Sequence, residues 1–114
     1  SDDGLDEISP YAKTNVIQLK DNKISEITIN PKELNINADK FENLVGDNAK
    51  FNATKMIEIF KGKDNDFSKA VCLNAAAGLI VNENCTNFNE AYDKTREHIL
   101  SGETFNHLNK MQNV

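Results

Sequence analysis

The segment from Asp66 to Val81 constrains the fold most, because apolar side chains lie almost all round it. Its spacing predicts a helix over residues 66–81, with Asn74 as the polar interruption of a long apolar run. A helix of this composition needs burial on most of its faces. A chain of 114 residues forms one modest core. That core is too small to cover this helix completely.

Two runs before this helix alternate apolar and polar residues, Asn15–Lys20 and Lys23–Ile29. The alternation predicts two strands. Asp21 and Asn22, which lie between the runs, tolerate left-handed backbone angles, so we expect a tight hairpin there. Pro31 should end the second strand because it has no N–H to donate to a ladder.

Helical spacing predicts three further helices. The first follows Asp47, a suitable N-cap, and stops at Gly62; the others cover residues 88–100 and the segment after Gly102. The apolar positions that define them are Ala49, Ala53, Ile57 and Phe60, then Phe88, Tyr92, Thr95 and Ile99, then Phe105, Leu108 and Met111.

These elements predict the α+β class, a β-hairpin followed by about four helices. We expect residues 1–114 to form one segment with an acidic loop (1–13), the hairpin (14–30) and the helices (46–113).

Charge and composition restrict the partners. Thirteen basic and eighteen acidic residues leave a net charge of −5, which repels phosphate backbones and anionic lipid headgroups. We therefore expect neither nucleic acid nor membrane as a partner. Cys72 and Cys85 lack zinc-ligand spacing and are too few for a disulfide-stapled scaffold, which favours the cytoplasm.

The sharpest chemical feature is the pair Asp6 and Glu7 in the string DGLDEIS, residues 3–9. Mg²⁺ typically takes one or two carboxylates and completes its octahedron with water and substrate phosphate oxygens. Adjacent acids on a loop suit that role. Acid-rich loops are also commonly just solvated, and the spacing alone leaves this alternative open.

No other residues form a catalytic constellation, so no catalytic residue is assigned. His98 and His107 have no nucleophile and acid arranged around them and are expected to be ordinary surface or boundary residues. Asn74 is expected to bond a facing backbone group.

At the DGLDEIS string the chain resembles the carboxyl-terminal third of the anthranilate phosphoribosyltransferase family, and the order and spacing hold over nearly all 114 residues. The other stretches that carry the resemblance are TNV (14–16), KISEI (23–27), GD (46–47), NA (52–53), LNAAA (73–77) and SG (101–102).

The resemblance implies a part of the larger α/β domain of a nucleoside phosphorylase or phosphoribosyltransferase-type fold. It implies transfer of phosphoribose from phosphoribosyl pyrophosphate to anthranilate in tryptophan biosynthesis, by a protein that is a homodimer at full length. In this family the acid pair helps hold Mg²⁺ on the pyrophosphate, a role that falls on Asp6 and Glu7.

The family's GTGGD loop, KHGN-type segment and anthranilate-binding arginine are missing from this sequence. We therefore expect the chain alone to be inactive. The alternatives are a non-catalytic binding or structural module derived from the family, and a nucleic-acid-binding paralogue. The negative charge and the intact acid pair argue against the paralogue.

Overall fold

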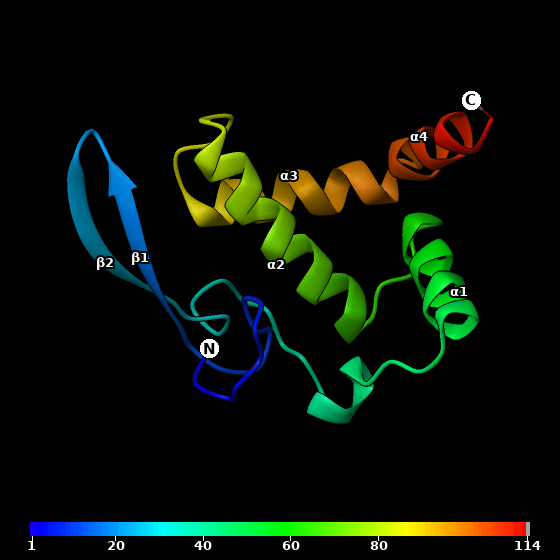
Figure 1. Ribbon diagram of the computed structural model, residues 1–114, viewed down its shortest axis with the longest axis horizontal. Helices are drawn as coiled ribbons and strands as arrows, with labels where there is room; N and C mark the ends of the chain where they lie inside the picture. Colours follow the sequence, from blue (N-terminus) through cyan, green and yellow to red (C-terminus); the bar gives the residue numbers. More distant parts are fainter. Residues whose placement is uncertain (114) are drawn as a thin grey trace.

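The computed structural model describes residues 1–113 and confirms the predicted class (Figure 1). An antiparallel hairpin stands beside a group of helices, with the amino-terminal loop beneath it. The elements are β1 (Thr14–Lys20), β2 (Lys23–Ile29), the short 3₁₀ helix η1 (Phe41–Leu44), α1 (Ala49–Phe60), α2 (Asp66–Val81), α3 (Phe88–Leu100) and α4 (Glu103–Gln112).

The hairpin turn is the one that its two central residues favour. Asp21 and Asn22 have φ values of 50° and 58°, the left-handed pair that matches the twist of a tight hairpin. The strands pair with Val16 opposite Ile27 and Lys20 opposite Lys23. β2 ends just before Pro31, as predicted.

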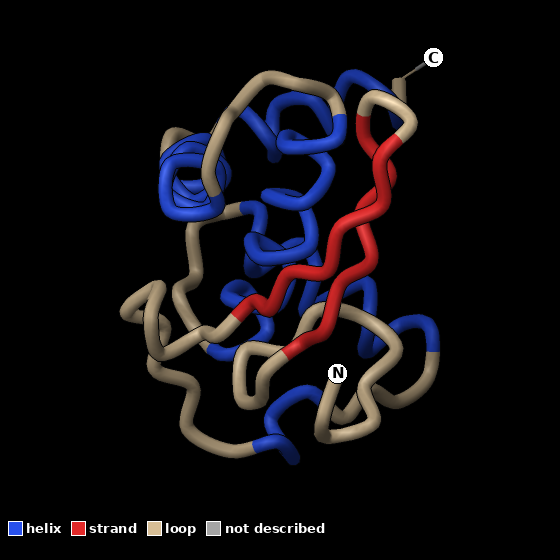
Figure 2. Tube along the Cα trace, turned by 90° about the vertical axis from the view of Figure 1, so that its left-hand side faces the viewer, coloured by secondary structure: helices blue, strands red, loops and turns tan. Residues whose placement is uncertain are grey.

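The hairpin carries apolar side chains on both faces. The face with Val16 and Ile27 turns toward the helices, and Ile29 at its base is buried. On the other face Ile17, Leu19 and Ile24 are 65%, 71% and 73% exposed. Figure 2 shows the two strands passing side by side in front of the helices.

Helix α2 begins where a capping box fixes it. The Asn65 side chain accepts from the N–H of Ser68, and the Ser68 hydroxyl accepts from the N–H of Asn65, both at 2.9 Å. Leu73 and Ala76 are fully buried where α2 packs on α3. Val81 at the other end is 79% exposed, so coverage of this apolar helix is incomplete, as its composition predicted.

The core forms around α2 and α3. Its buried members are Ile36, Ile59, Cys72, Leu73, Ala76, Cys85, Ala91, Tyr92 and Ile99. The predicted stripe of α3 is thus on the inside, and both cysteines are buried and free. In contrast, α4 contributes no buried residue, and its Met111 is 62% exposed.

The N-cap predicted for α1 is wrong by one residue. Asn48 caps this helix by accepting from the N–H of Phe51 at 3.0 Å. Asp47 lies outside because the Asn52 side chain holds its backbone, accepting from its N–H at 3.0 Å and donating to its carbonyl at 2.9 Å. The predicted stop is confirmed: Gly62 has a φ of 93°, which favours glycine.

Helix η1 was not predicted, because the polar residues before it carry no helical pattern. Its Phe41 packs against the Tyr11 ring at a centroid distance of 5.9 Å. Within the described residues, no helix is long and apolar enough to cross a membrane.

Replacing Leu73 by alanine tests the position of the core. Leu73→Ala should lower the free energy of unfolding by about 2–5 kcal/mol, because it leaves a cavity between α2 and α3. Val81→Ala on the same helix should cost well under about 1 kcal/mol because that side chain is exposed. Denaturant unfolding measures both, and equal losses would contradict this packing.

Candidate metal-binding site

The acidic loop, residues 1–13, is irregular in structure and folds around Asp3. One carboxylate oxygen of Asp3 accepts from the Ser1 hydroxyl at 2.6 Å and from the N–H of Leu5 at 3.2 Å. The other oxygen accepts from the Ser9 hydroxyl at 2.5 Å. Partial burial raises the pKa of Asp3, but the hydrogen bonds from Ser1 and Ser9 outweigh it, and the net pKa is lowered. Both carboxylate oxygens of Asp3 are therefore used in hydrogen bonds that stabilise the loop.

Ser9 closes the loop from inside. It is fully buried, and its hydroxyl oxygen accepts from the N–H groups of Tyr11 at 3.0 Å and Ala12 at 3.2 Å. Gly4 has a φ of 83°, which a side chain would strain. These contacts fix the backbone on both sides of the acid pair.

Asp6 and Glu7 are exposed on the fixed loop. Within residues 1–113 neither carboxylate makes a hydrogen bond or an ion pair, and no three acidic, histidine or cysteine side chains gather into a metal-binding group. Two available carboxylates with no third protein ligand fit Mg²⁺, which keeps several waters and phosphate oxygens. They do not fit a closed cation cage.

Asn74 joins this loop to α2. The N–H of Ile8 donates to Oδ1 of Asn74 at 3.0 Å, and Nδ2 of Asn74 donates back to the Ile8 carbonyl at 3.0 Å. The same Nδ2 donates to the Ala70 carbonyl at 2.9 Å. The predicted backbone partner of Asn74 is thus confirmed, and it is the residue that follows Glu7.

Asp66 at the start of α2 is a second anchor, and sequence reasoning missed it. Its buried carboxylate accepts hydrogen bonds from donors in three other segments and from Lys69, one turn further along α2. The donors are the Tyr11 hydroxyl (3.0 Å), the N–H groups of Asp39 (2.9 Å) and Lys40 (3.3 Å), the Asn43 side chain (2.8 Å) and the Lys69 ammonium (3.0 Å).

The charge of Asp66 is maintained by these donors. Burial alone would raise its pKa, but the hydrogen bonds from Asn43 and Lys69 lower it far below the usual range. Burial, together with the bond to Asp66, raises the pKa of Tyr11. Tyr11 therefore stays a neutral donor and Asp66 an ionised acceptor at neutral pH.

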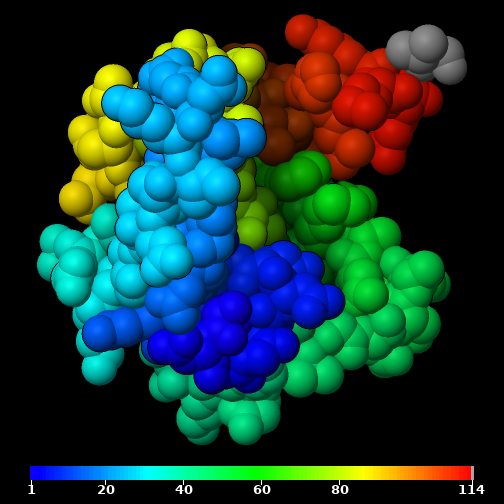
Figure 3. Space-filling view, turned by 60° about the vertical axis from the view of Figure 1, so that its left-hand side comes forward, coloured from blue at the N-terminus to red at the C-terminus, as the bar shows by residue number. Residues whose placement is uncertain are grey.

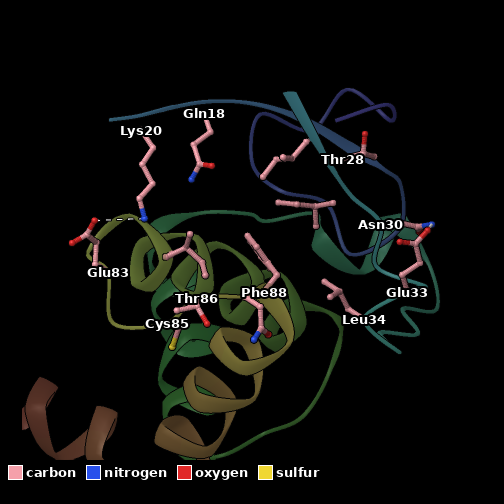
Figure 4. Close-up of a pocket in the computed structure, with 14 residues that line it drawn as sticks. Gln18, Lys20, Thr28, Asn30, Glu33, Leu34, Glu83, Cys85, Thr86 and Phe88 are labelled. Atoms are coloured by element: carbon pink, nitrogen blue, oxygen red, sulfur yellow. Dashed lines mark hydrogen bonds and ion pairs between the residues drawn. The ribbon is translucent and has the colours of Figure 1, made fainter. Parts of the chain in front are cut away.

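A groove of about 390 Å³ lies between the hairpin and the adjoining ends of α2 and α3 (Figure 4). Its lining includes Ile27, Phe88 and Cys85 but neither Asp6 nor Glu7. Lys20 and Glu83 pair across one end at 3.6 Å, and both are largely exposed. Figure 3 shows the hairpin and the amino-terminal loop on one face of the molecule, with the loop at the foot of the strands.

The remaining candidates are separate from the loop. His98 on α3 and His107 on α4 are exposed, as expected. The sequence did contain a signal for Asn74, because it is the polar residue in an apolar helix. It contained no comparable signal for Asp66, which looked like an ordinary first residue of a helix.

Residues 1–105 match the family described as "Glycosyl transferase family, a/b domain", so the chain belongs to that family. This agrees with the fold, a hairpin followed by helices that form part of an α/β domain.

Within this family, the chain is similar to curated proteins named anthranilate phosphoribosyltransferase, which confirms the resemblance expected from the motifs. It is 71% identical to the one from Pelagibacter ubique over 114 residues, which are all of this chain and 34% of that protein. It is 36% identical to the Priestia megaterium protein (96% and 33% covered) and 35% identical to that of Methanosarcina acetivorans (97% and 30% covered). The chain therefore spans about a third of the length of these relatives.

The Asp66 anchor predicts a pH dependence of stability. Because its pKa is lowered by folding, the stability that Asp66 contributes is present above its unfolded pKa of about 3.9 and is lost as the pH falls through the folded pKa. Asp66→Asn should lower the free energy of unfolding at pH 7 by about 3 kcal/mol and flatten its pH dependence below about pH 4.

Denaturant unfolding at a series of pH values measures this, with Asp93→Asn, an exposed carboxylate on α3, as the control. An Asp66→Asn variant with wild-type stability at pH 7 would contradict the role of Asp66 as an anchor.

Proposed function

We propose that this chain is the carboxyl-terminal part of an anthranilate phosphoribosyltransferase, an enzyme that transfers phosphoribose from phosphoribosyl pyrophosphate to anthranilate. The observation that carries the proposal is the exposed acid pair, Asp6 and Glu7, on a loop fixed from both sides. The names of the related proteins support the reaction.

We propose that Asp6 and Glu7 hold Mg²⁺, directly or through water. A bound Mg²⁺ would neutralise the negative charge that builds on the pyrophosphate oxygens as the pyrophosphate group leaves the ribose carbon. The carboxylates themselves repel pyrophosphate, as does a chain with a net charge of −5. This repulsion makes binding of the anionic substrate at this loop dependent on the cation.

The other loop residues position the acid pair. Asp3 and Ser9 fix the backbone around the pair through the 2.5 Å hydrogen bond between their side chains, and Asn74 holds the backbone that follows it. A fixed backbone lowers the entropy lost when a metal orders the two carboxylates. The chain thus provides one wall of a site, to which the residues that cradle phosphate and seat the acceptor must be added.

Replacing both acids tests the metal assignment. In the full-length protein that carries this segment, Asp6→Asn with Glu7→Gln should cut turnover by at least about a hundredfold, because the site loses both of its charged ligands. The Mg²⁺ concentration for half-maximal activity should rise. Steady-state assays over a magnesium series measure both effects.

The matched control is Asp93→Asn with Glu97→Gln, which removes two exposed carboxylates of α3 and the same net charge. It should leave turnover and magnesium dependence unchanged. Wild-type turnover by the Asp6–Glu7 double variant at low magnesium would remove the metal assignment and favour a solvated loop in a binding or structural module.

The 114 residues alone should form no product from phosphoribosyl pyrophosphate and anthranilate. The sequence lacks the glycine-rich phosphate loop of the family, and its acid pair repels the substrate unless Mg²⁺ is bound. Product assays with added Mg²⁺ measure this, using the full-length protein as the positive control. Turnover by the isolated chain would contradict the division of the site proposed above.

A further inference from the structure

Asn74 and Asp66 are the two side chains of α2 that hydrogen-bond to the acidic loop within residues 1–113, and Asn74 is the one that bonds next to the acid pair. Its side chain exchanges two hydrogen bonds of 3.0 Å with the N–H and the carbonyl of Ile8, a residue 66 positions away in the chain. We propose that Asn74 is a positioning residue that sets the affinity of Asp6 and Glu7 for Mg²⁺. This inference rests on the proposed function.

The contact determines the orientation of the loop backbone. Asn74 donates to the Ile8 and Ala70 carbonyls and accepts from the Ile8 N–H, so both amide hydrogens and the amide oxygen are in use. A flipped amide would place two donors or two acceptors together. One peptide unit on each side of Ile8 is therefore held in a single orientation, and the first of these units is joined to Glu7.

The acid pair is bracketed by this contact and by Asp3. Before the pair, Asp3 holds the N–H of Leu5 at 3.2 Å, and after it Asn74 holds Ile8. Between these two positions, Asp6 and Glu7 are exposed, and within residues 1–113 their side chains make no hydrogen bond or ion pair that would fix them. The relative position of the two carboxylates thus depends on the backbone, and Asn74 controls its carboxyl-terminal side.

Two substitutions separate this role from simple packing. Asn74→Asp keeps the shape and the acceptor for the Ile8 N–H, but it replaces the donor to the Ile8 carbonyl by a carboxylate oxygen. Asn74→Ala removes both hydrogen bonds to Ile8. Changes to groups that orient metal ligands typically weaken metal binding by about 10–100-fold, and we expect each variant to fall in this range.

The experiment uses the full-length protein that carries this segment. The affinity for Mn²⁺ is measured by titration, using the paramagnetic resonance signal of the free ion. The affinity for Mg²⁺ is measured by calorimetric titration, and neither measurement requires turnover. Hydrogen exchange on the same samples should show faster exchange of the Ile8 amide in Asn74→Ala, which lacks its acceptor, than in Asn74→Asp, which keeps it.

Thr95→Val is the matched control. Its hydroxyl lies 3.2 Å from the Cys72 carbonyl and 2.8 Å from the Tyr92 carbonyl, so the variant loses a buried hydrogen bond beside α2 that does not involve the acidic loop. The melting temperature of this variant should fall, while its Mg²⁺ and Mn²⁺ affinities stay at the wild-type values.

Unchanged metal affinities in Asn74→Asp, with binding abolished in Asp6→Asn/Glu7→Gln, would overturn the role of Asn74 and leave the proposed function standing. Equal weakening by Thr95→Val would also overturn it, because the effect would then follow stability alone.

Wild-type metal affinity in the Asp6–Glu7 variant would instead overturn the proposed function. If the Asn74 variants do not fold, the wild-type protein decides: an Ile8 amide that exchanges as fast as an unstructured one excludes the contact.

Discussion

The segments on either side of the hairpin have little regular structure, so they depend on hydrogen bonds to polar side chains of α2. Asp66 collects donors from the loop before β1 and from the segment around η1, and Asn74 holds Ile8. The two anchors are eight residues apart on α2 (Asp66–Val81), about 12 Å along its axis. If these contacts were lost, the loop that carries the acid pair would be held to the core by apolar packing, such as that of the Ile8 side chain, without its hydrogen bonds to α2.

This arrangement explains the presence of Asp66 and Asn74 in so apolar a helix. Leu73 and Ala76 face the core with α3. Asp66 lies one heptad before Leu73 on the same side of α2 and bonds the loops around the start of the helix, whereas Asn74 lies on another side and bonds Ile8. Both polar side chains have their hydrogen bonds satisfied, which removes the penalty of burying them. The same helix therefore supports the hydrophobic core and positions the candidate site.

Periodicity was sufficient to predict the hairpin and the four helices, because their patterns are local: alternation in β1 and β2 and apolar stripes in the helices. The N-cap of α1 was missed because Asp47 and Asn48 are both good caps, and only the side chain of Asn52 decides between them. Helix η1 was missed because the polar residues before it carry no helical pattern. The Asp66 anchor was missed because its donors on Tyr11, Asp39 and Asn43 lie more than twenty residues away in sequence.

For the candidate site, the sequence identified the residue types but not their support. The string of residues 3–9 indicated Asp6 and Glu7, and the position of Asn74 indicated a backbone partner. The sequence did not show that Asp3 bonds to Ser9 within the loop or that Asn74 bonds to Ile8. Both contacts depend on how the chain folds in three dimensions. A three-dimensional structure was needed to separate the structural acid from the two available ones.

In the proposed function, the carboxylates of Asp6 and Glu7 hold a divalent cation on the substrate. Anomalous diffraction from crystals of the full-length protein with Mn²⁺ and phosphoribosyl pyrophosphate tests it most directly. If Asp6 and Glu7 hold the cation, the manganese peak lies in contact with pyrophosphate oxygens and with both side chains, at about 2.1 Å or through a shared water. A manganese ion bound elsewhere, with the Asp6 and Glu7 side chains directed into bulk solvent, would contradict their role as metal ligands.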